Sequence, residues 1–272
     1  PKIDAACFGI AGPVINGRCR TTNLPWDITT EDLQKHLGVD KVRLLNDLES
    51  TAYGMLYVPE DQFVDLNSTG RKMDGNRAII AAGTGLGEAM LYYDGEHYNP
   101  IGSEGGHCDF APVTVQQDEL LKWMRNRFPG HVSYERILSG PGIYTLYEFL
   151  LETGYAPAPA SMINIPEGKD RSAAVSECAL KEKDPVCKEA LRLFAEIYGA
   201  EAGNLALKCM SLGGVYIGGG IAPKILPVLT KEHFMVGFRS KGRFEEMLRG
   251  MEVKISLNPE TSLLGAAHYA ID

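Results

Sequence analysis

The sequence predicts an α/β protein with a largely parallel sheet, divided into two lobes. Short apolar runs alternate with segments of helical period along the chain, which is the pattern of strand–helix–strand units. The strand-like runs gather in two separate regions, near residues 3–45 and 78–101, and this separation indicates the two lobes. Of 272 residues, 44% are hydrophobic and 23% are charged, a balance typical of one large or two medium globular domains.

The first region begins with an apolar run over residues 3–10, which predicts a buried strand. Asn16-Gly17 then predicts a tight hairpin, because both residues tolerate positive φ. A helix follows, with Thr29 as its N-cap and Gly38 as its end.

Two further strands end in small or polar residues. Residues 42–45 lead into Asn46-Asp47 and a short helix, and residues 78–82 lead into Gly83-Thr84-Gly85-Leu86-Gly87. Residues 89–101 then predict a second hairpin.

Helical segments dominate the chain from about residue 116. The clearest begins at Asp184-Pro185, an N-cap followed by proline at the first helical position. Residues 215–217 predict a strand that enters Gly218-Gly219-Gly220, and Pro223 is expected to open the next helix. The apolar positions that keep the helical period after Asp184 are Cys187, Leu191, Phe194, Tyr198, Ala202, Leu205 and Cys209.

Composition and charge exclude several classes of function. A formal net charge of −8 argues against a broad face for nucleic acid, although a local nucleotide pocket remains open. The sequence has no run of about 18 apolar residues, so we expect no membrane span. The six cysteines are scattered without a Cys-x-x-Cys pair, which favours free, buried thiols in a reducing, cytoplasmic compartment over disulfides or a zinc site.

Several short segments could carry chemistry, and each also has an ordinary structural explanation. The glycines of Gly83-Thr84-Gly85 would let backbone amides approach a phosphate, or they simply form a sharp turn; neither a Walker A loop nor a dinucleotide fingerprint is present. Glu104 and His107, separated by two glycines, match a sugar hydroxyl, which both donates and accepts hydrogen bonds. The alternative for His107 is a structural histidine or a metal ligand, and metal is disfavoured because no second His or Cys falls at ligand spacing.

Three more candidates lie elsewhere in the chain. Asn46 and Asp47 follow a strand, where open α/β sheets place ligand groups, or else Asp47 caps the helix after it. Glu135 is either a site carboxylate or an ordinary helix-surface residue. The three glycines at 218–220 leave the backbone without side chains, so a purine ring and a nearby phosphate could lie against it. The alternative is that they allow a helix to pack closely on the strand.

Taken together, these segments resemble bacterial-type ATP-dependent glucokinases of the hexokinase and actin-like ATPase superfamily. Their order and spacing cover nearly the whole chain, and the combination is specific although each piece is weak. The zinc-site cysteine stretch of the related repressor and sugar-kinase family is missing, which favours the metal-free glucokinase branch. The matching segments are Leu45-Asn46-Asp47, Gly83 to Gly87, Glu104 to Pro112, His131 to Gly142, Gly203-Asn204-Leu205-Ala206-Leu207, Gly213 to Pro223 and Leu263-Leu264-Gly265.

The resemblance implies a role for each matched residue. Asp47 would be the general base that takes the proton of the glucose 6-hydroxyl, and the other sugar hydroxyls would meet Asn46, Glu104, His107 and Glu135. Gly83, Thr84 and Gly85 would form the second phosphate loop, and Gly218, Gly219 and Gly220 the adenosine-binding turn. The reaction would move the terminal phosphoryl group of ATP to glucose, with Mg²⁺ arriving on the nucleotide.

The resemblance also implies an actin-like ATPase (ribonuclease H-like) fold with a cleft between lobes, and a homodimer. We expect the small lobe to comprise residues 1–57 and 253–272 and the large lobe residues 58–252. The family's first phosphate loop, Asp-x-Gly-Gly-Thr-x-x-Arg, does not occur in this sequence. We therefore expect the small lobe to be incomplete at its N-terminus, and two explanations stay open. The favoured one is that this sequence is a piece of a longer chain that carries the loop. The alternative is a protein that lacks the loop, whose kinase activity we would expect to be weak or absent even where glucose binds.

Two rival functions remain at this point. One is a kinase for another hexose, or one that uses polyphosphate or ADP as donor. The other is a sugar-binding regulator without catalysis, although no DNA-binding domain is visible and Asp47 favours an enzyme.

Overall fold

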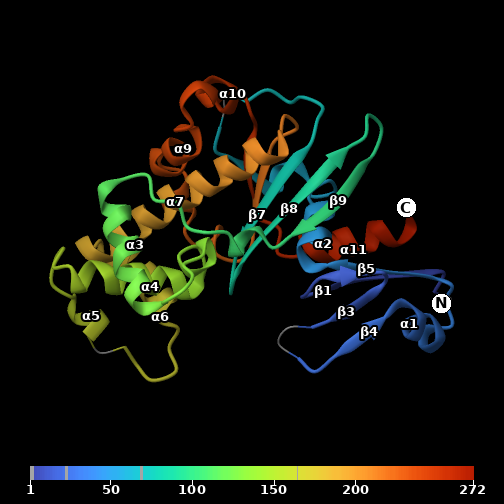
Figure 1. The fold of residues 1–272 in the computed structure, drawn as a ribbon, viewed down its shortest axis with the longest axis horizontal. Helices are drawn as coiled ribbons and strands as arrows, with labels where there is room; N and C mark the ends of the chain where they lie inside the picture. The colour runs from blue at the N-terminus through green and yellow to red at the C-terminus, as the bar shows by residue number, and fades with distance from the viewer. Residues whose placement is uncertain (1–2, 22–23, 68–69, 164) are drawn as a thin grey trace.

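The strands form three sheets in the computed structural model, which describes residues 3–21, 24–67, 70–163 and 165–272 (Figure 1). The largest sheet has the order β6-β11-β10-β7-β8-β9, and two smaller sheets have the orders β1-β5 and β2-β3-β4. The strands are β1 (Ala5–Ile10), β2 (Val14–Ile15), β3 (Arg18–Arg20), β4 (Asp27–Thr29), β5 (Lys41–Asn46), β6 (Phe63–Asp65), β7 (Arg77–Ala82), β8 (Leu86–Tyr93), β9 (Tyr98–Ser103), β10 (Val215–Gly218) and β11 (Val253–Ser256).

The helices gather mainly on the large sheet, and none in the described part of the chain is long and apolar enough to cross a membrane. The longest, α7, is buried along nearly its whole length, and the predicted apolar period is confirmed in it. The helices are α1 (Thr30–Leu37), α2 (Asp47–Gly54), α3 (Val115–Arg127), α4 (Gly140–Glu152), α5 (Ala160–Ile163), α6 (Arg171–Glu177), α7 (Pro185–Cys209), α8 (Leu226–Leu229), α9 (Glu232–Arg239), α10 (Glu245–Arg249) and α11 (Thr261–Ile271).

The predicted turns and caps of the first region are confirmed. Asn16 and Gly17 have φ of 51° and 70°, which is the hairpin geometry that their sequence predicts. Thr29 caps α1, since its hydroxyl accepts the Asp32 N–H at 3.1 Å. Gly38 ends α1 with φ 65°.

The large sheet is less parallel than the sequence suggests. The pairs β10–β11 and β10–β7 are parallel, whereas the pairs β11–β6, β7–β8 and β8–β9 are antiparallel. The expectation of a largely parallel sheet is therefore wrong here, because the β7–β8–β9 hairpins contribute half of the strands. In the smaller β1-β5 sheet the pairing is parallel.

Helices α2 and α11 lie together between the β1-β5 sheet and the β8-β9 end of the large sheet (Figure 1). Their backbones meet closely: a Cβ atom on Gly54 would lie 1.8 Å from the Thr261 carbonyl oxygen, and one on Gly265 would lie 1.8 Å from the Ser50 carbonyl oxygen. The Ser50 hydroxyl also donates to the Ser262 carbonyl at 2.7 Å. Both helices fall within the expected small lobe, and α2 also packs on β8 and β9 of the large sheet.

The C-terminal stretch is divided between the sheets. We expected residues 253–272 to fall in the small lobe as a whole, but β11 is hydrogen-bonded inside the large sheet and only α11 packs on β1 and β5. The expected helix start at Pro223 is also wrong. Residues 221–225 form a hydrogen-bonded turn, closed by Lys224 and Ile225 N–H groups on the Ile221 carbonyl, and α8 begins later.

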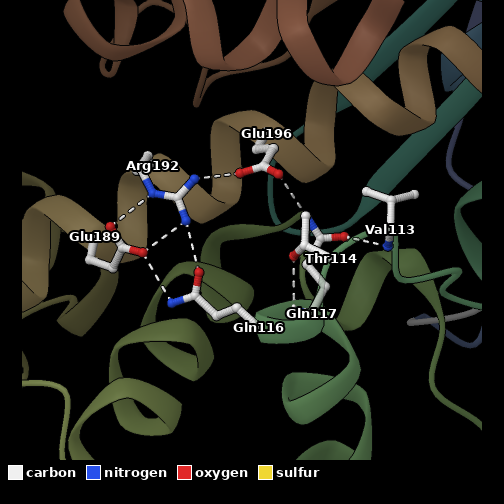
Figure 2. Close-up of polar contacts among 7 residues, drawn as sticks. All are labelled: Val113, Thr114, Gln116, Gln117, Glu189, Arg192 and Glu196. Atoms are coloured by element: carbon white, nitrogen blue, oxygen red, sulfur yellow. Dashed lines mark hydrogen bonds and ion pairs between the residues drawn. The ribbon is translucent and has the colours of Figure 1, made fainter. Parts of the chain in front are cut away.

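A polar cluster joins α3 to α7 (Figure 2). The Arg192 guanidinium donates to Glu189 at 2.8 Å, to Gln116 at 2.9 Å and to Glu196. The negative charges of Glu189 and Glu196 are therefore both balanced by the Arg192 guanidinium at this partly buried contact between helices.

All six cysteines are free thiols. Cys19, Cys178 and Cys187 are buried as expected, and Cys7 and Cys209 are half-buried. Cys108 is exposed, so the expected burial is wrong there; it follows the 3-10 turn Gly105–His107 and its side chain lies outside the core.

Candidate active site

A cavity of about 530 Å³ is lined by residues that directly follow β1, β5, β7 and β9, together with the first turns of α2. The five polar residues picked out from sequence all line it, although they come from three separate segments. The lining residues are Ala11, Gly12, Asn46, Asp47, Leu48, Thr51, Ala81, Gly83, Thr84, Gly85, Leu86, Gly87, Ser103, Glu104, His107, Glu135, Gly219 and Ser262.

The start of α2 presents Asp47 to this cavity. Asn46, not Asp47, is the N-cap, since its Oδ1 accepts the Leu48 N–H at 2.8 Å. The Asn46 Nδ2 donates to the Gly12 carbonyl at 3.0 Å, which fixes the amide beside the cavity. Asp47 is thus not the N-cap, although its Oδ1 also accepts the Leu48 N–H at 2.9 Å.

Glu49 completes a capping box and joins α2 to β9. Its carboxylate accepts the Asn46 N–H at 2.8 Å and the Gly102 N–H at 3.1 Å. Because one side chain holds both backbones, the Asn46-Asp47 corner and the strand that leads to Glu104 keep a fixed relative position.

Partial burial raises the pKa of Asp47 above its ordinary value near 3.8. Hydrogen bonds from the Leu48 N–H and the Asn46 side chain oppose this effect by favouring the charged form. A carboxylate with a raised pKa is a stronger proton acceptor than an exposed one, which suits a general base.

The opposite wall carries Glu104, His107 and Glu135. Glu135 Oε2 accepts the Leu86 N–H at 3.0 Å, and its Oε1 lies 4.0 Å from His107 Nε2. Glu135 lies on a short 3-10 turn (Tyr134–Arg136) and is half-buried, so the helix-surface interpretation is wrong. A Cβ atom on Gly85 would lie 2.4 Å from Glu135 Oε2, so this carboxylate can occupy its place only beside a glycine.

The glycine loop between β7 and β8 forms the floor. Gly83, Thr84 and Gly85 all line the cavity, and the Gly83 N–H closes a tight turn on the Gly85 carbonyl at 2.8 Å. Of the later glycines only Gly219 lines it; Gly218 is buried at the end of β10 and Gly220 is exposed outside the lining. Gly219 needs to be glycine, since its φ is 84° and a Cβ atom would lie 2.3 Å from the Ala82 carbonyl oxygen.

A second cavity, of about 420 Å³, lies next to this floor. Gly140, at the start of α4, lines it and donates its N–H to the Gly83 carbonyl at 2.8 Å. The turn after Gly220 lines it as well, through Ile221. Sequence reasoning missed the rest of the lining, because no motif distinguishes these residues from ordinary ones. They are Ile143, Asp170, Ser172, Ala173, Ser176, Glu177, Leu180, Lys181, Lys224 and Ile225.

Three possible metal ligands also lie together, with ligand atoms of Cys178, Asp184 and Cys187 within 4.8 Å of one another. Asp184 already caps α7, where its Oδ1 accepts the Cys187 N–H at 3.0 Å. Burial raises the pKa of both thiols, which opposes the thiolate form that metals bind. This cluster is separate from His107 and from the cavity described above.

Comparison with known proteins connects this geometry to one family. The family profile described as "Glucokinase" matches residues 1–272. The glucokinase of Nostoc punctiforme is 39% identical over 279 residues, which span 98% of this chain and 82% of that protein. The crystal structure of a glucokinase from an Antarctic psychrotroph has a TM-score of 0.85 at 30% identity, covering 97% of this chain and 79% of that chain.

A more distant structure supports the fold alone. The ROK family glucokinase from Streptomyces griseus, solved with glucose and AMPPNP, has a TM-score of 0.67 at 19% identity and covers 99% of this chain and 82% of that chain. These likenesses confirm the actin-like ATPase fold of sugar kinases. With the profile match over residues 1–272 and the 39% identity to a curated relative, they show that the chain belongs to the glucokinase family.

Proposed function

We propose that this chain transfers the terminal phosphoryl group of ATP to the 6-hydroxyl of glucose, giving glucose 6-phosphate and ADP. The observation that carries the proposal is the meeting of Asn46, Asp47, Glu104, His107 and Glu135 on one cavity of about 530 Å³. A hexose presents hydroxyls that each donate and accept hydrogen bonds, and this wall supplies carboxylates, an amide and an imidazole to pair with them.

The nucleotide lies on the other side of the glycine loop in this proposal. The adenosine occupies the second cavity, against Ile143 and Ile221, and the phosphates extend past Gly83-Thr84-Gly85 toward Asp47. Gly83 lines the first cavity and its carbonyl accepts the N–H of Gly140, which lines the second, so the two cavities lie next to each other at this hydrogen bond.

Magnesium fits this arrangement as part of the nucleotide. A hard cation takes oxygen ligands, and the Thr84 hydroxyl, which lines the cavity on the proposed phosphate path, would offer one beside the phosphate oxygens of the nucleotide. Bound with ATP, Mg²⁺ would neutralise part of the charge on the phosphates.

Asp47 acts as the general base in this mechanism. It accepts the proton of the 6-hydroxyl as that oxygen attacks the terminal phosphorus, while the other four side chains orient the sugar. Phosphoryl transfer has a loose transition state, so orientation and charge stabilisation supply most of the rate enhancement. Closure of the lobes over the sugar excludes water and limits hydrolysis of ATP.

A coupled assay for glucose 6-phosphate tests this proposal. Glucose should be compared with mannose and fructose as acceptors, and ATP with ADP and polyphosphate as donors. We expect the highest kcat/KM with glucose and ATP. A higher kcat/KM with another pair would identify that acceptor and donor as the substrates instead. A glucose-dependent rise in Tm without ADP production at any donor concentration would favour a non-catalytic sugar sensor.

The cellular setting and assembly are part of the same proposal. Six free cysteines favour a reducing compartment, and we place the enzyme in the cytoplasm. We also propose a homodimer, which light scattering should report as twice the mass of the chain.

A further inference from the structure

Two buried glutamates lie directly behind the wall that we assign to glucose. Glu88 on β8 is 1% exposed and Glu201 on α7 is 0% exposed. Their carboxyl groups are close enough to hydrogen-bond to each other, and Oε1 of each has no hydrogen-bond partner. Two carboxylates in this position cannot both be ionised without a large cost, so the pair retains a proton.

The surrounding groups decide which carboxyl carries that proton. The Glu201 carboxylate accepts hydrogen bonds from the Asn204 amide, at 2.8 Å, and from the Tyr134 hydroxyl. Lys208 Nζ lies 3.5 Å from its Oε1. Glu88 receives none of these donors in the described part of the chain. Glu201 is therefore the carboxylate and Glu88 the carboxylic acid.

The remaining titratable neighbours do not change this assignment. Lys241 adds positive charge toward Glu201, while its ammonium donates to the Ala200 carbonyl at 2.9 Å. The Tyr198 hydroxyl and the Cys209 thiol are neutral near Glu88, and burial raises the pKa of both. Burial and the charge of Glu201 raise the pKa of Glu88, and the positive charge of Lys208 opposes them without reversing the shift.

Glu88 also supports the turn that carries Glu104 and His107. A Cβ atom on Gly105 would lie 2.1 Å from Glu88 Oε2, so the turn rests directly on the carboxyl group. Ser103 adds a backbone connection: its hydroxyl donates to the Glu88 carbonyl at 2.9 Å and accepts the Gly105 N–H at 3.2 Å.

We propose that Glu88 is a positioning residue for glucose binding: its protonated carboxyl, paired with Glu201, holds the Gly105 turn in the geometry that the sugar requires. Loss of the Glu88 proton to solvent at alkaline pH places a second negative charge beside Glu201. The pair then moves apart or admits water, and the turn shifts. This proposal rests on the assignment of the cavity to glucose.

The test is the pH dependence of glucose binding in the wild type and in Glu88→Gln. Glutamine keeps the shape and a hydrogen-bond donor but has no ionisable proton. Calorimetric titration gives the Kd for glucose from neutral to alkaline pH without any nucleotide, and the assay gives KM and kcat. We expect the wild-type Kd and KM to rise about ten-fold, the change that corresponds to a coupling of one pKa unit, with kcat nearly constant. In Glu88→Gln the Kd and the KM for glucose should not change over the same pH range.

A second variant keeps the inference testable if Glu88→Gln does not fold. Glu201→Gln removes the neighbouring charge and lowers the pKa of Glu88, so the rise in Kd should move to lower pH. An identical alkaline rise in the wild type and in either folded variant overturns the role of Glu88. A wild-type protein that binds no glucose at any pH overturns the proposed function itself.

Discussion

Replacement of Asp47 by asparagine separates sugar binding from chemistry. The Asp47 Oδ1 accepts the Leu48 N–H at 2.9 Å, and an asparagine oxygen can retain that bond, so the first turn of α2 should be preserved. The amide can still donate to a sugar hydroxyl but cannot take its proton. We expect the Kd for glucose to change by only a few-fold.

The expected loss falls on turnover. A positioned general base contributes about 10²–10⁴-fold, so kcat should fall at least about 100-fold, or about 2.7 kcal/mol in the barrier. The wild-type kcat should also decline on the acid side at a pH above the ordinary aspartate value near 3.8, because burial raises the pKa of Asp47. The residual activity of the variant should lack this decline.

The assay is the coupled detection of glucose 6-phosphate across pH, with calorimetry for sugar binding. Asp109→Asn is a matched control, since this carboxylate is 91% exposed, pairs with His131 and does not line the cavity. It should leave kcat unchanged. A kcat for Asp47→Asn near the wild-type value would refute the general-base role.

Three further predictions concern packing and charge. Gly85→Ala should raise the glucose KM at least about ten-fold in the coupled assay, because the added methyl occupies the place of Glu135 Oε2; an unchanged KM would show that this carboxylate does not meet the sugar. Arg192→Ala should lower the free energy of unfolding by about 2 kcal/mol in urea titration, because it leaves two partly buried carboxylates without their cation (Figure 2); a loss below about 0.5 kcal/mol would make the cluster incidental. Stability of the wild type should fall as pH rises from about 4.5 through the raised pKa of Glu88, since the folded state binds the extra proton there, and Glu88→Gln should weaken that decline; equal slopes of Tm against pH would contradict the protonated pair.

Features set by neighbouring residues could be predicted from the sequence. The Asn16-Gly17 hairpin, the Thr29 cap and the Asp184 cap each depend on contacts within a few residues, and all three are confirmed. The expected fold class is confirmed as well. It could be predicted because the short motifs occur in the family's order along the chain. The five polar residues of the sugar wall could be chosen for the same reason, although their roles stay predictions.

Features set by contacts between distant segments could not be predicted. The strand pattern gives no sign that Glu88 is buried, since its partner Glu201 lies on α7 and the pairing depends on the packing of that helix against the sheet. The place of β11 in the large sheet depends on its pairing with β6 and β10. Ser172 and Ser176 likewise reach the second cavity only through the docking of α6 on α4.

A crystal structure of the protein with glucose bound tests the central claim most directly. We expect the sugar in the cavity of about 530 Å³, with its 6-hydroxyl about 2.6–3.2 Å from the Asp47 carboxylate and its other hydroxyls on Asn46, Glu104, His107 and Glu135. A glucose molecule bound elsewhere, or bound in this cavity with its 6-hydroxyl directed away from Asp47, would contradict the account.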